Sequence, residues 1–550
     1  MVFQKSESRS VATALPLAFP VMKRWRRFIV ALLAFACGIP SLPAALVTVG
    51  ANQNLTRAAG NQYETSVAIN PTNSQLVFMA SRHEPGGLYT ARSSDGGVTW
   101  TNKLIGQNSV APAGNIPRAY GNTTVAWDSF GNLFVAFLSQ ASAGSLGTYV
   151  ALAVSKDGGS TFYAPYGTGP AIVLPAVTPA WIGDQPTVTV GPGVNGVPGS
   201  VWLTYWSNGG ILVSGANVSS SGTVSNFVSQ VLPGQPAGVN FGDIAIGPNG
   251  EVAVTYGPNS GSSGNIYVQV NTNGVSGAFA LPRLVTPVNL GGFAFIPAQP
   301  NWGVDPEAGL AWDRSSGPHR GWLYLVYTDA PFPGSADTDI YVVASDDLGG
   351  TWNPRVRVND DAGTNSQFLP HLSLDQSSGN VAVTWYDARH ATANQTAQYY
   401  GAISTDGGAG FGANFPISAG TSDQARSIAA LKKADYGDYT GNAFANGVLI
   451  PAWGDNSNST GDNPDGTTDF DVYTAPVYVL PPLGLTQSAG NLILTWPTNA
   501  VNYVLQENAG LNPAGWTNSL AAPQNSGGQK QVTLTLTNSQ RFFRLKHPGP

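Results

Sequence analysis

A recurring octapeptide constrains the fold of this chain more than any other feature of its sequence. Its pattern is Ser-x-Asp-x-Gly-x-Thr followed by Trp or Phe; the copies are Ser93–Trp100, Ser155–Phe162, Ser345–Trp352 and Ser404–Phe411, the last with Gly410 in place of Thr. Asp and Ser side chains cap backbone N–H groups in tight turns, and glycine accepts the positive φ that such turns need. We therefore expect structural roles at hairpin turns, and no catalytic role, for Asp95, Asp157, Asp347 and Asp406.

Each octapeptide belongs to a longer unit, which contains an apolar strand that ends in aromatic or polar residues. Such strands follow one another at spacings of about 50–70 residues, the length of one blade of a β-propeller. They are Leu76–Ser81, Leu133–Leu138, Val201–Trp206, Val252–Tyr256, Trp322–Asp329, Val381–Asp387 and Val448–Asp455. Two units carry only degenerate octapeptides, around Ser219–Gly222 and Asn271–Gly274. The pattern predicts an all-β chain with a seven-bladed propeller over residues 46–480; six blades are the alternative if two weak units merge.

The two ends of the propeller region differ from the repeats. The last unit stops short of a fourth strand, and we expect Leu46–Asn54 to supply it, because a closed ring leaves no exposed sheet edge. After Val479–Pro482 the pattern changes to short strands such as Leu492–Trp496 and Gln531–Leu536. Residues 481–550 are predicted to form a small β-sandwich of the fibronectin type, which serves as a spacer or an attachment module.

The N-terminus is typical of an export signal. Met22–Arg27 is strongly basic, Phe28–Cys37 is an apolar run too short to span a bilayer, and Ser41–Ala45 supplies small residues for cleavage. We interpret residues 1–45 as a signal peptide, with Met22 as the expected start; a membrane anchor is the alternative. The predicted location is secreted, periplasmic or at the cell surface, with no membrane span in the mature chain.

Charge and cysteine content narrow the range of partners. The chain has a net charge of −6, and its predicted leader is basic, so the mature protein is more acidic still. This balance argues against nucleic acid and against anionic membrane surfaces as partners. The single cysteine, Cys37, lies in the leader, so we expect no disulfide bonds and a monomer stabilised by a large core.

A ligand site is expected on the face opposite the octapeptide turns, where first strands begin and second strands end; we call this face the mouth. Carboxylates beside aromatic side chains suit sugars, because aromatic faces stack on pyranose rings while carboxylates bind hydroxyl groups or transfer protons. Our catalytic candidates are Glu307, Asp387 and Asp438; the ligand-binding candidates are Arg82, Asp184, Asp243, Trp385, Tyr386, Arg389 and Trp453. For each acid the alternative is a structural role between blades, and for Asp387 an internal ion pair with Arg389.

The segment from Asp455 to Asp471 is rich in aspartate and is a hypothetical site for a structural calcium ion, which prefers oxygen ligands. It does not match the Asp-x-Asp-x-Asp-Gly calcium pattern, because Pro464 follows shortly after Asp462. A solvated acidic loop is the alternative. No cofactor is expected to be required, and the identity of any bound metal is left open.

The octapeptide and its surrounding units resemble the Asp-box, or BNR repeat, of exported propellers of the sialidase-like superfamily, over roughly residues 58–480. True sialidases are six-bladed and use an arginine triad, an Asp acid/base and a Tyr nucleophile paired with Glu. Here Tyr63–Ser66 stands where the first arginine is expected and contains none. Arg82, Arg389 and Arg426 do not assemble into a recognisable triad, so exo-sialidase activity is not expected.

Three functions are compatible with these residues, because a fold does not choose among them. The first is action on carbohydrate, as a glycoside hydrolase of unknown specificity with two mouth carboxylates. The second is a non-catalytic extracellular binding or adhesion propeller. The third is a polysaccharide lyase that would use His83, His390 or Tyr386. The expected partner in each case is a carbohydrate or glycoconjugate.

Overall fold

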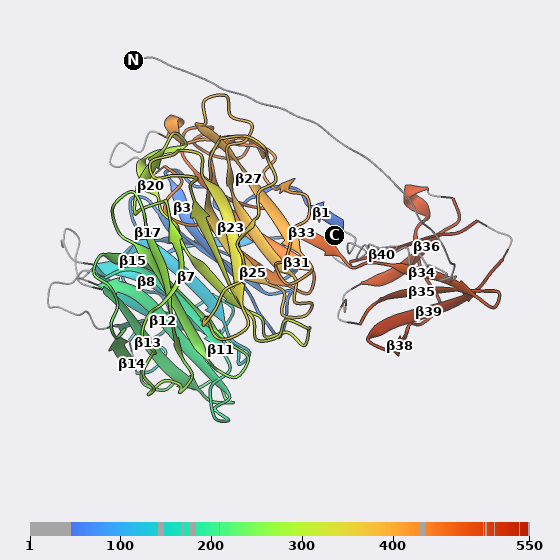
Figure 1. Cartoon of the computed structure of the whole chain (residues 1–550), viewed down its shortest axis with the longest axis horizontal. Coiled ribbons are helices and arrows are strands. Elements are labelled where there is room, and N and C mark those ends of the chain that lie inside the picture. Colours follow the sequence, from blue (N-terminus) through green and yellow to red (C-terminus); the bar gives the residue numbers. More distant parts are fainter. Residues whose placement is uncertain are drawn as a thin grey trace, which may run out of the picture. The chain divides into compact units, whose positions relative to one another are not determined.

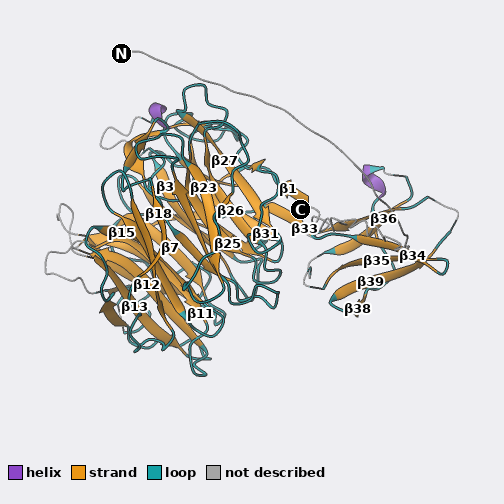
Figure 2. Ribbon diagram, in the orientation of Figure 1, coloured by secondary structure: helices purple, strands orange, loops and turns teal. Residues whose placement is uncertain are grey.

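The computed structural model describes residues 46–547 apart from gaps at 141–147, 168, 175–182, 208–209, 428–434, 499, 501–502, 511 and 538–539. The predicted signal peptide therefore lies outside the described residues. Strands account for almost all regular structure, and the described helical segments are two 3-10 turns, η1 (Gln424–Arg426) and η2 (Pro513–Gly515) (Figure 2). Among the described residues, no helical segment combines the length and the apolar character needed to cross a bilayer.

Four antiparallel sheets of four strands follow one another from the N-terminal side. The first contains β3 (Gln62–Ile69), β4 (Val77–His83), β5 (Leu88–Ser93) and β6 (Thr101–Ile105). The second contains β7 (Ala119–Trp127), β8 (Leu133–Gln140), β9 (Thr148–Ser155) and β10 (Ile172–Val173). The third contains β11 (Gly183–Gly191), β12 (Gly199–Ser207), β13 (Gly210–Val218) and β14 (Val228–Val231). The fourth contains β15 (Val239–Ile246), β16 (Val252–Pro258), β17 (Gly264–Asn271) and β18 (Arg283–Val288).

The next sheets depart slightly from this plan. A short hairpin, β19 (Ala294–Ile296) and β20 (Gln299–Val304), precedes the sheet of β21 (Gly309–Trp312), β22 (Leu323–Asp329), β23 (Asp339–Ser345) and β24 (Val356–Arg357). The following sheet contains β25 (Gln367–Leu374), β26 (Val381–Asp387), β27 (Thr396–Ser404), β28 (Phe415–Pro416) and β29 (Ser422–Asp423). The last sheet of this region combines β30 (Gly441–Ala445), β31 (Val448–Asp455), β32 (Asp471–Thr474) and β33 (Val477–Leu480) with β1 (Leu46–Val49) and β2 (Gln53–Asn54).

The two N-terminal strands complete that last sheet. Leu46 pairs with Leu480 at one end of β1, and Gln53 of β2 pairs with Thr474. The prediction that Leu46–Asn54 compensates for the truncated last unit is therefore confirmed. This pairing joins the two ends of the propeller region across more than 400 residues of chain and places β1 and β2 at the edges of the last sheet.

The sheets are arranged as a β-propeller (Figure 1). The first strand of each sheet contacts the first strand of the next: β3 with β7, β7 with β11, β11 with β15, β15 with β21, β21 with β25, β25 with β30, and β30 with β3. The second strands β4, β16, β22 and β26 are buried along their entire length, because both faces of each sheet pack against neighbouring sheets. Predicted strands Val381–Asp387 and Val448–Asp455 coincide with β26 and β31.

Each octapeptide forms the turn between the third and fourth strands of a sheet. In the first copy, Asp95 Oδ1 accepts hydrogen bonds from Ser93 Oγ at 2.7 Å and from the Thr99 backbone N–H at 2.9 Å, while its Oδ2 accepts Thr99 Oγ1 at 2.5 Å. The copies around Asp157 and Asp347 repeat this pattern. These hydrogen bonds favour the ionised carboxylate and hold the pKa of Asp347 down to about 2.

The C-terminal region contains two further sheets. One contains β34 (Gly484–Ser488), β35 (Asn491–Pro497), β39 (Gln529–Thr535) and β38 (Gln524–Ser526), and the other β37 (Thr517–Asn518), β36 (Val504–Asn508) and β40 (Phe542–Lys546). Side chains of both sheets, among them Trp496, Leu505 and Leu545, form one buried cluster. The hydroxyl of Tyr503 donates to the carbonyl of Val479 at 2.8 Å, close to where the propeller sequence ends.

Candidate functional site

An irregularity in the first strands creates the site. The pairing register between first and second strand shifts near the mouth end of β3, β7, β11, β15 and β25. At four of these shifts a non-glycine residue has positive φ: Glu64 (54°), Asn122 (44°), Gln185 (44°) and Leu369 (51°). Glu307, just before β21, has a φ of 41°. A β-bulge bends the strand and redirects a side chain. These irregularities therefore turn into the channel side chains that a regular strand would bury between sheets.

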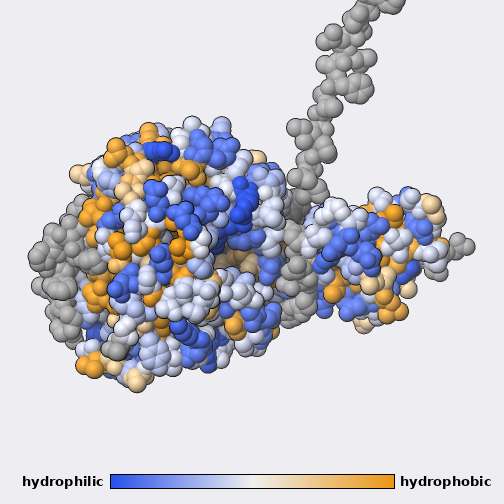
Figure 3. Space-filling view, turned by 90° about the horizontal axis from the view of Figure 1, so that it is seen from below, coloured by the Kyte–Doolittle hydropathy of each residue, from blue (hydrophilic) through white to orange (hydrophobic). Residues whose placement is uncertain are grey.

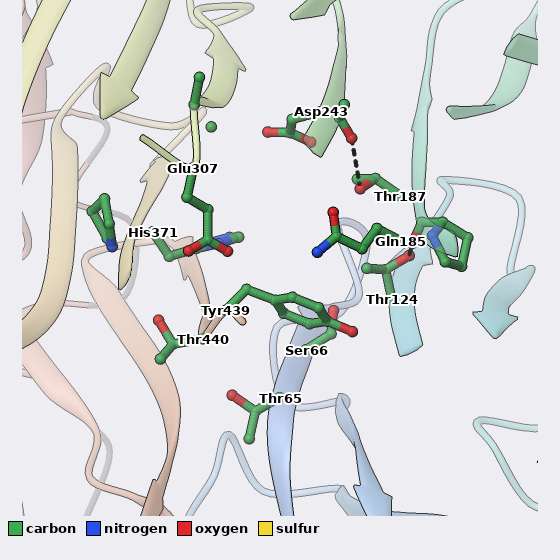
Figure 4. Close-up of a pocket in the computed structure, with 15 residues that line it drawn as sticks. Thr65, Ser66, Thr124, Gln185, Thr187, Asp243, Glu307, His371, Tyr439 and Thr440 are labelled. Carbon is green, nitrogen blue, oxygen red and sulfur yellow. Dashed lines mark hydrogen bonds between the residues drawn. The ribbon is translucent and has the colours of Figure 1, made fainter. Parts of the chain in front are cut away.

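The redirected residues surround a central cavity of about 90 Å³. Its lining comes from first strands around the ring, and includes Ser66, Thr124, Gln185, Thr187, Asp243, Glu307, His371, Tyr439 and Thr440. Figure 4 shows the side chains of Glu307, Gln185 and Tyr439 extending into this space from different strands. The cavity has room for several water molecules and is lined with polar groups that water or a sugar hydroxyl can bind.

Acidic side chains gather around the channel, and two of them, Asp243 and Glu307, line the central cavity. Burial raises the pKa of Glu307, and the neighbouring charges of Asp305 and Asp438 raise it further. Burial also raises the pKa of Asp438, with further contributions from Glu64 and Asp184. Two carboxyl groups that repel each other in a buried site cannot both ionise easily, so burial and mutual repulsion favour the protonated forms of these acids.

Glu307 and Asp438 differ in their contacts. Glu307 Oε2 has no contact with solvent and no hydrogen-bond partner, although both residues are only half-buried as whole residues. Asp438 Oδ1 accepts a hydrogen bond from the indole Nε1 of Trp302. Of the three predicted catalytic residues, Glu307 lines the central cavity, and Asp438 directly precedes the lining residue Tyr439 and is close enough for its charge to raise the pKa of Glu307.

Other channel acids are tied to the backbone. Asp243 accepts hydrogen bonds from the backbone N–H groups of Ile244 and Leu310, at 2.7 and 2.6 Å, and burial raises its pKa to about 6. Asp305 accepts from the Glu307 N–H at 2.6 Å, and burial raises its pKa to about 7. Asp184 accepts from its neighbour Gln185 and from Asn122 Nδ2. These bonds hold the ends of adjacent first strands in place.

Arg82 has no freedom to bind a ligand carboxylate by itself. Its guanidinium lies 3.6 Å from Glu64 and 3.7 Å from Glu84, and between the rings of Tyr63 and Tyr120, at 5.3 and 5.2 Å from their centroids. The side chain is buried, and Gly121 leaves space for it, since a Cβ there would lie 2.8 Å from Arg82 Cδ. No lysine or arginine lines the central cavity among the described residues.

Asp387 and Arg389 belong to a separate cluster. Arg389 contacts Asp387 at 2.8 Å, Asp360 at 2.8 Å and the ring of Tyr400, while Asp387 also accepts hydrogen bonds from the Arg389 N–H and from Trp385 Nε1. Neither Asp387 nor Arg389 lines the central cavity. The contacts of this cluster hold the Asp387–Arg389 ion pair in place. Asp387 is therefore not brought together with Glu307 and Asp438.

The aromatic residues that were predicted to bind a ligand are buried. Trp385, Tyr386 and Trp453 are each at most 1% exposed. Trp453 Nε1 donates to Asp455 at 3.0 Å, in the same way that Trp385 donates to Asp387 at 2.8 Å. Residues i and i+2 of a strand lie on one face, so the Trp-x-Asp pattern in two successive second strands builds the same internal bond. Tyr386 donates to the carbonyl of Gly454 at 2.8 Å and thereby links these two sheets.

Exposed aromatic side chains lie instead on the β19–β20 hairpin. Phe295 is 66% exposed and Phe293 40% exposed. The hairpin is anchored to the chain just before β30: Asp435 accepts hydrogen bonds from the backbone N–H groups of Asn301 and Trp302, and Trp302 reaches Asp438. The anchor places the indole of Trp302 beside the carboxyl group of Asp438.

Sequence reasoning missed His371 and the hydroxyl lining. His371 is neutral, because burial lowers its pKa to about 4. A signal was present in the repeats: Ser66, Thr124, Thr187 and His371 occupy equivalent positions in their first strands, each two residues beyond a residue with positive φ, and all four line the cavity. Aligning first strands instead of second strands would have found them.

The carboxylates of the Asp455–Asp471 segment have protein partners. Asp462 pairs with Arg57 at 2.8 Å, Asp465 accepts the Gly60 N–H, and Asp471 accepts Asn54 and Thr56. Within the described part of the chain, no group of three or more His, Cys, Asp or Glu side chains is arranged to hold a metal ion. The segment's contacts tie the end of the propeller region to its beginning.

Fold and cavity together define a β-propeller with an acidic central channel. No protein-family model matches the chain, and neither does any curated protein sequence. Among solved structures, it is similar to a phage phi92 endosialidase (11% identity, 87% of this chain and 75% of that one, TM-score 0.42). It is also similar to a polysaccharide lyase (9% identity, 78% of this chain and 99% of that one, TM-score 0.44). A third similar structure is an α-L-arabinanase from Penicillium chrysogenum (13% identity, 62% of this chain and 94% of that one, TM-score 0.36). At these scores the similarities carry no argument about activity.

Proposed function

We propose that this protein is an exported, carbohydrate-active β-propeller whose mouth binds a saccharide and hydrolyses a glycosidic bond. The observation that carries the proposal is the pair Glu307, which lines the central cavity, and Asp438, whose charge acts on Glu307; the pKa values of both are raised by burial and by the charges around them. Such pairs supply the acid and the base that glycoside hydrolysis needs.

The proposed chemistry follows from the sharing of protons. One carboxyl group, whose raised pKa favours its protonated form, donates its proton to the leaving glycosidic oxygen as the C–O bond breaks. The ionised partner takes a proton from the attacking water or attacks the sugar itself. We assign the acid to Asp438, since Trp302 orients its carboxyl group, and the base or nucleophile to Glu307, whose Oε2 has no other partner.

Binding of the sugar is assigned to the β19–β20 hairpin. The exposed rings of Phe293 and Phe295 offer apolar faces for stacking, and Trp302 continues this surface toward Asp438. The substrate class is a neutral saccharide. A sialic acid or uronate carboxylate needs a free guanidinium, and Arg82 is already shared between Glu64 and Glu84.

The test is an assay of purified protein with neutral glycans, sialosides and uronate polysaccharides, following new reducing ends and the ultraviolet absorbance of unsaturated uronate. New reducing ends from a neutral glycan are expected, with a loss of at least about 100-fold in Glu307→Gln and in Asp438→Asn. Asp346→Asn, an exposed change in an octapeptide turn, is the control and retains activity. Ultraviolet absorbance would replace the proposal with a lyase.

A non-catalytic binding propeller is the second candidate, and one observation favours it. Asp243, Asp305 and Asp387 are committed to backbone groups or to Arg389, as in a channel that only holds blades together. In that case no product forms from any glycan, while a glycan array still shows binding that Phe295→Ala weakens. Absence of both hydrolysis and binding would overturn both candidates.

The number of blades, the C-terminal module, the export signal, the oligomeric state and a calcium ion are also proposals. We infer seven blades, with support from the circuit of contacts that runs through β3, β7, β11, β15, β21, β25 and β30 and returns to β3. Residues 481–550 are proposed to be a fibronectin-type sandwich for attachment, and residues 1–45 an export signal. A monomer agrees with the face in Figure 3, where hydrophobic residues form small patches among hydrophilic ones. A structural calcium ion is retained as a hypothesis for metal analysis of the purified protein.

A further inference from the structure

A second cavity lies on the face that carries the octapeptide turns, far along the strands from the mouth. It has a volume of about 560 Å³ and lies between the first two sheets of the propeller. Its lining includes Arg92 at the end of β5, Trp127 at the end of β7, and Lys156 just after β9. Nothing in the proposed carbohydrate chemistry at the mouth uses this cavity.

Trp127, a residue of this lining, has an unsatisfied hydrogen-bond donor. The residue is 6% exposed, and its indole Nε1 is buried without a hydrogen-bond partner. Trp312 occupies the equivalent position at the end of β21, opposite the first residue of its second strand, and its Nε1 donates to the carbonyl of Gly321 at 2.8 Å. A buried N–H without a partner destabilises the folded state, so an unpaired indole in the lining of a cavity points to a ligand acceptor.

Positive charge gathers around this indole. Arg92 and Lys156 line the cavity, and Arg92 and Lys103 line an adjoining one of about 200 Å³. None of these three residues forms an ion pair within the described chain; Arg92 and Lys103 donate only to Ser160. In a protein with a net charge of −6, a group of unpaired cations on one face is a local exception.

Two acids lie near the cations, and both are committed to turns. Asp157 accepts hydrogen bonds from Ser155, Ser160 and Thr161, and Asp128 accepts from Asn132 and from the Phe130 N–H. Their charges reduce the local positive potential without occupying the N–H donors of Arg92, Lys156 or Trp127. The donors available to a ligand are therefore a guanidinium, an ammonium and an indole N–H, none of which can accept a hydrogen bond.

We propose that this cavity between the first two sheets binds an oxyanion, a carboxylate or sulfate group, carried by an acidic polysaccharide. The oxyanion accepts hydrogen bonds from Arg92 and Trp127 and is neutralised further by Lys156, while Lys103 meets the next charge along the polymer. The two faces of the propeller then have opposite preferences: the mouth takes a neutral sugar, and the octapeptide face holds an anionic chain.

The direct test follows the indole N–H of Trp127 by NMR in protein labelled with ¹⁵N-tryptophan, the resonance being assigned by its absence in Trp127→Phe. Three probes are added separately: sodium sulfate, oligogalacturonate and neutral dextran. The Trp127 resonance is expected to shift with sulfate or oligogalacturonate and to stay in place with dextran. An unmoved Trp127 resonance with both anions overturns the proposal.

Affinity for oligogalacturonate, measured by calorimetry at low salt, supplies the second test. Trp127→Phe is expected to weaken binding about tenfold, while the matched control Trp312→Phe, which removes an indole already bonded to protein, leaves it unchanged. Arg92→Gln combined with Lys156→Gln, both at exposed positions where folding is preserved, abolishes measurable binding; Lys546→Gln does not. Equal weakening by all charge changes would mean non-specific attraction and would overturn the site. Glu307→Gln leaves this binding intact, so failure here is separate from failure at the mouth.

Discussion

The indole Nε1 of Trp302 donates a hydrogen bond to the carboxylate of Asp438, which lies 136 residues further along the chain. Trp302 lies on an irregular hairpin between two sheets, and Asp438 precedes the first strand of the last sheet. The bond thus connects the exposed aromatic surface to the acid that we assign to proton transfer. A hydrogen bond to the ionised form of a carboxyl group favours that form and lowers its pKa.

Replacement of Trp302 by Phe should therefore raise the pKa of Asp438. If Asp438 acts as the general acid, activity is lost as the pH rises through this pKa, so the alkaline limb of the pH–rate profile should move upward by about one pH unit. The profile of kcat/KM against pH measures the shift. Asn301→Ala, which removes a neighbouring bond to Asp435 only, is the control. An alkaline limb that stays in place, or moves downward, contradicts the assignment.

Stability should depend on pH through Asp305. Burial raises its pKa from 3.8 to about 7, so the folded state holds a proton that the unfolded state loses. The stabilisation is complete below about pH 4 and is lost as the pH rises to about 7, by at most about 4 kcal/mol. Asp305→Asn cannot titrate and still accepts the Glu307 N–H.

Urea unfolding at pH 5 and pH 7.5 measures this contribution. The original protein should lose more stability between the two values than Asp305→Asn, because the variant lacks the titrating group. Identical losses in both proteins would mean that Asp305 has an ordinary pKa in the folded state.

The pair Asp387–Arg389 should matter for stability more than for chemistry. Asp387→Ala leaves the half-buried Arg389 without its 2.8 Å partner and leaves Trp385 Nε1 unbonded, so a loss of about 3–5 kcal/mol is expected. Asp360→Ala removes the other, largely exposed partner of the same arginine and should cost less than about 1 kcal/mol. Chemical denaturation compares the two. An Asp387 variant of normal stability but greatly reduced hydrolysis would return Asp387 to the catalytic group.

A substitution in the fourth octapeptide should make the folded protein more stable. Gly410 stands where the other copies have Thr, and Asp406 consequently lacks a hydroxyl donor on Oδ2. A Cβ at Gly410 would lie 3.6 Å from Asp406 Oδ2, an ordinary contact, and the backbone there does not require glycine. Gly410→Thr should raise the free energy of unfolding by about 1 kcal/mol, through reduced chain entropy and one exposed hydrogen bond.

Gly410→Ala separates these two contributions, since alanine restricts the unfolded chain without adding a hydroxyl. We expect thermal unfolding midpoints in the order glycine, alanine, threonine. If threonine is no better than alanine, the hydroxyl bond seen at Thr99 and Thr351 adds nothing to stability.

Much of the fold was readable from sequence, because it depends on local patterns. The octapeptide bonds of Asp95 and Asp347 join residues at most four positions apart, so a short motif specifies them completely. Strand β26 coincides with the predicted Val381–Asp387, since a run of apolar residues between turns marks a strand buried on both faces. The pairing of Leu46 with Leu480 followed from a missing strand in the last repeat.

The site was readable only in part. Glu307 and Asp438 were found because each occurs just before a first strand; the ring places Glu307 on the cavity and brings the charge of Asp438 close enough to act on it. Asp387 and Trp453 satisfied the same kind of argument from second strands, yet the structure buries them in bonds to their own neighbours. The sequence shows at which end of a sheet a side chain lies. Whether that side chain enters the channel depends on the β-bulge that redirects it.

What the sequence determined by itself was the repeat, the strands and turns within it, and the acidic character of the chain, because these depend on residues close together along the backbone. The tertiary structure alone decided which acids share one cavity, that Arg82 is already held by Glu64 and Glu84, and that Trp127 lacks the partner that Trp312 has. Those relationships join different blades, and their energies depend on distance, burial and competing partners, which closure of the ring sets.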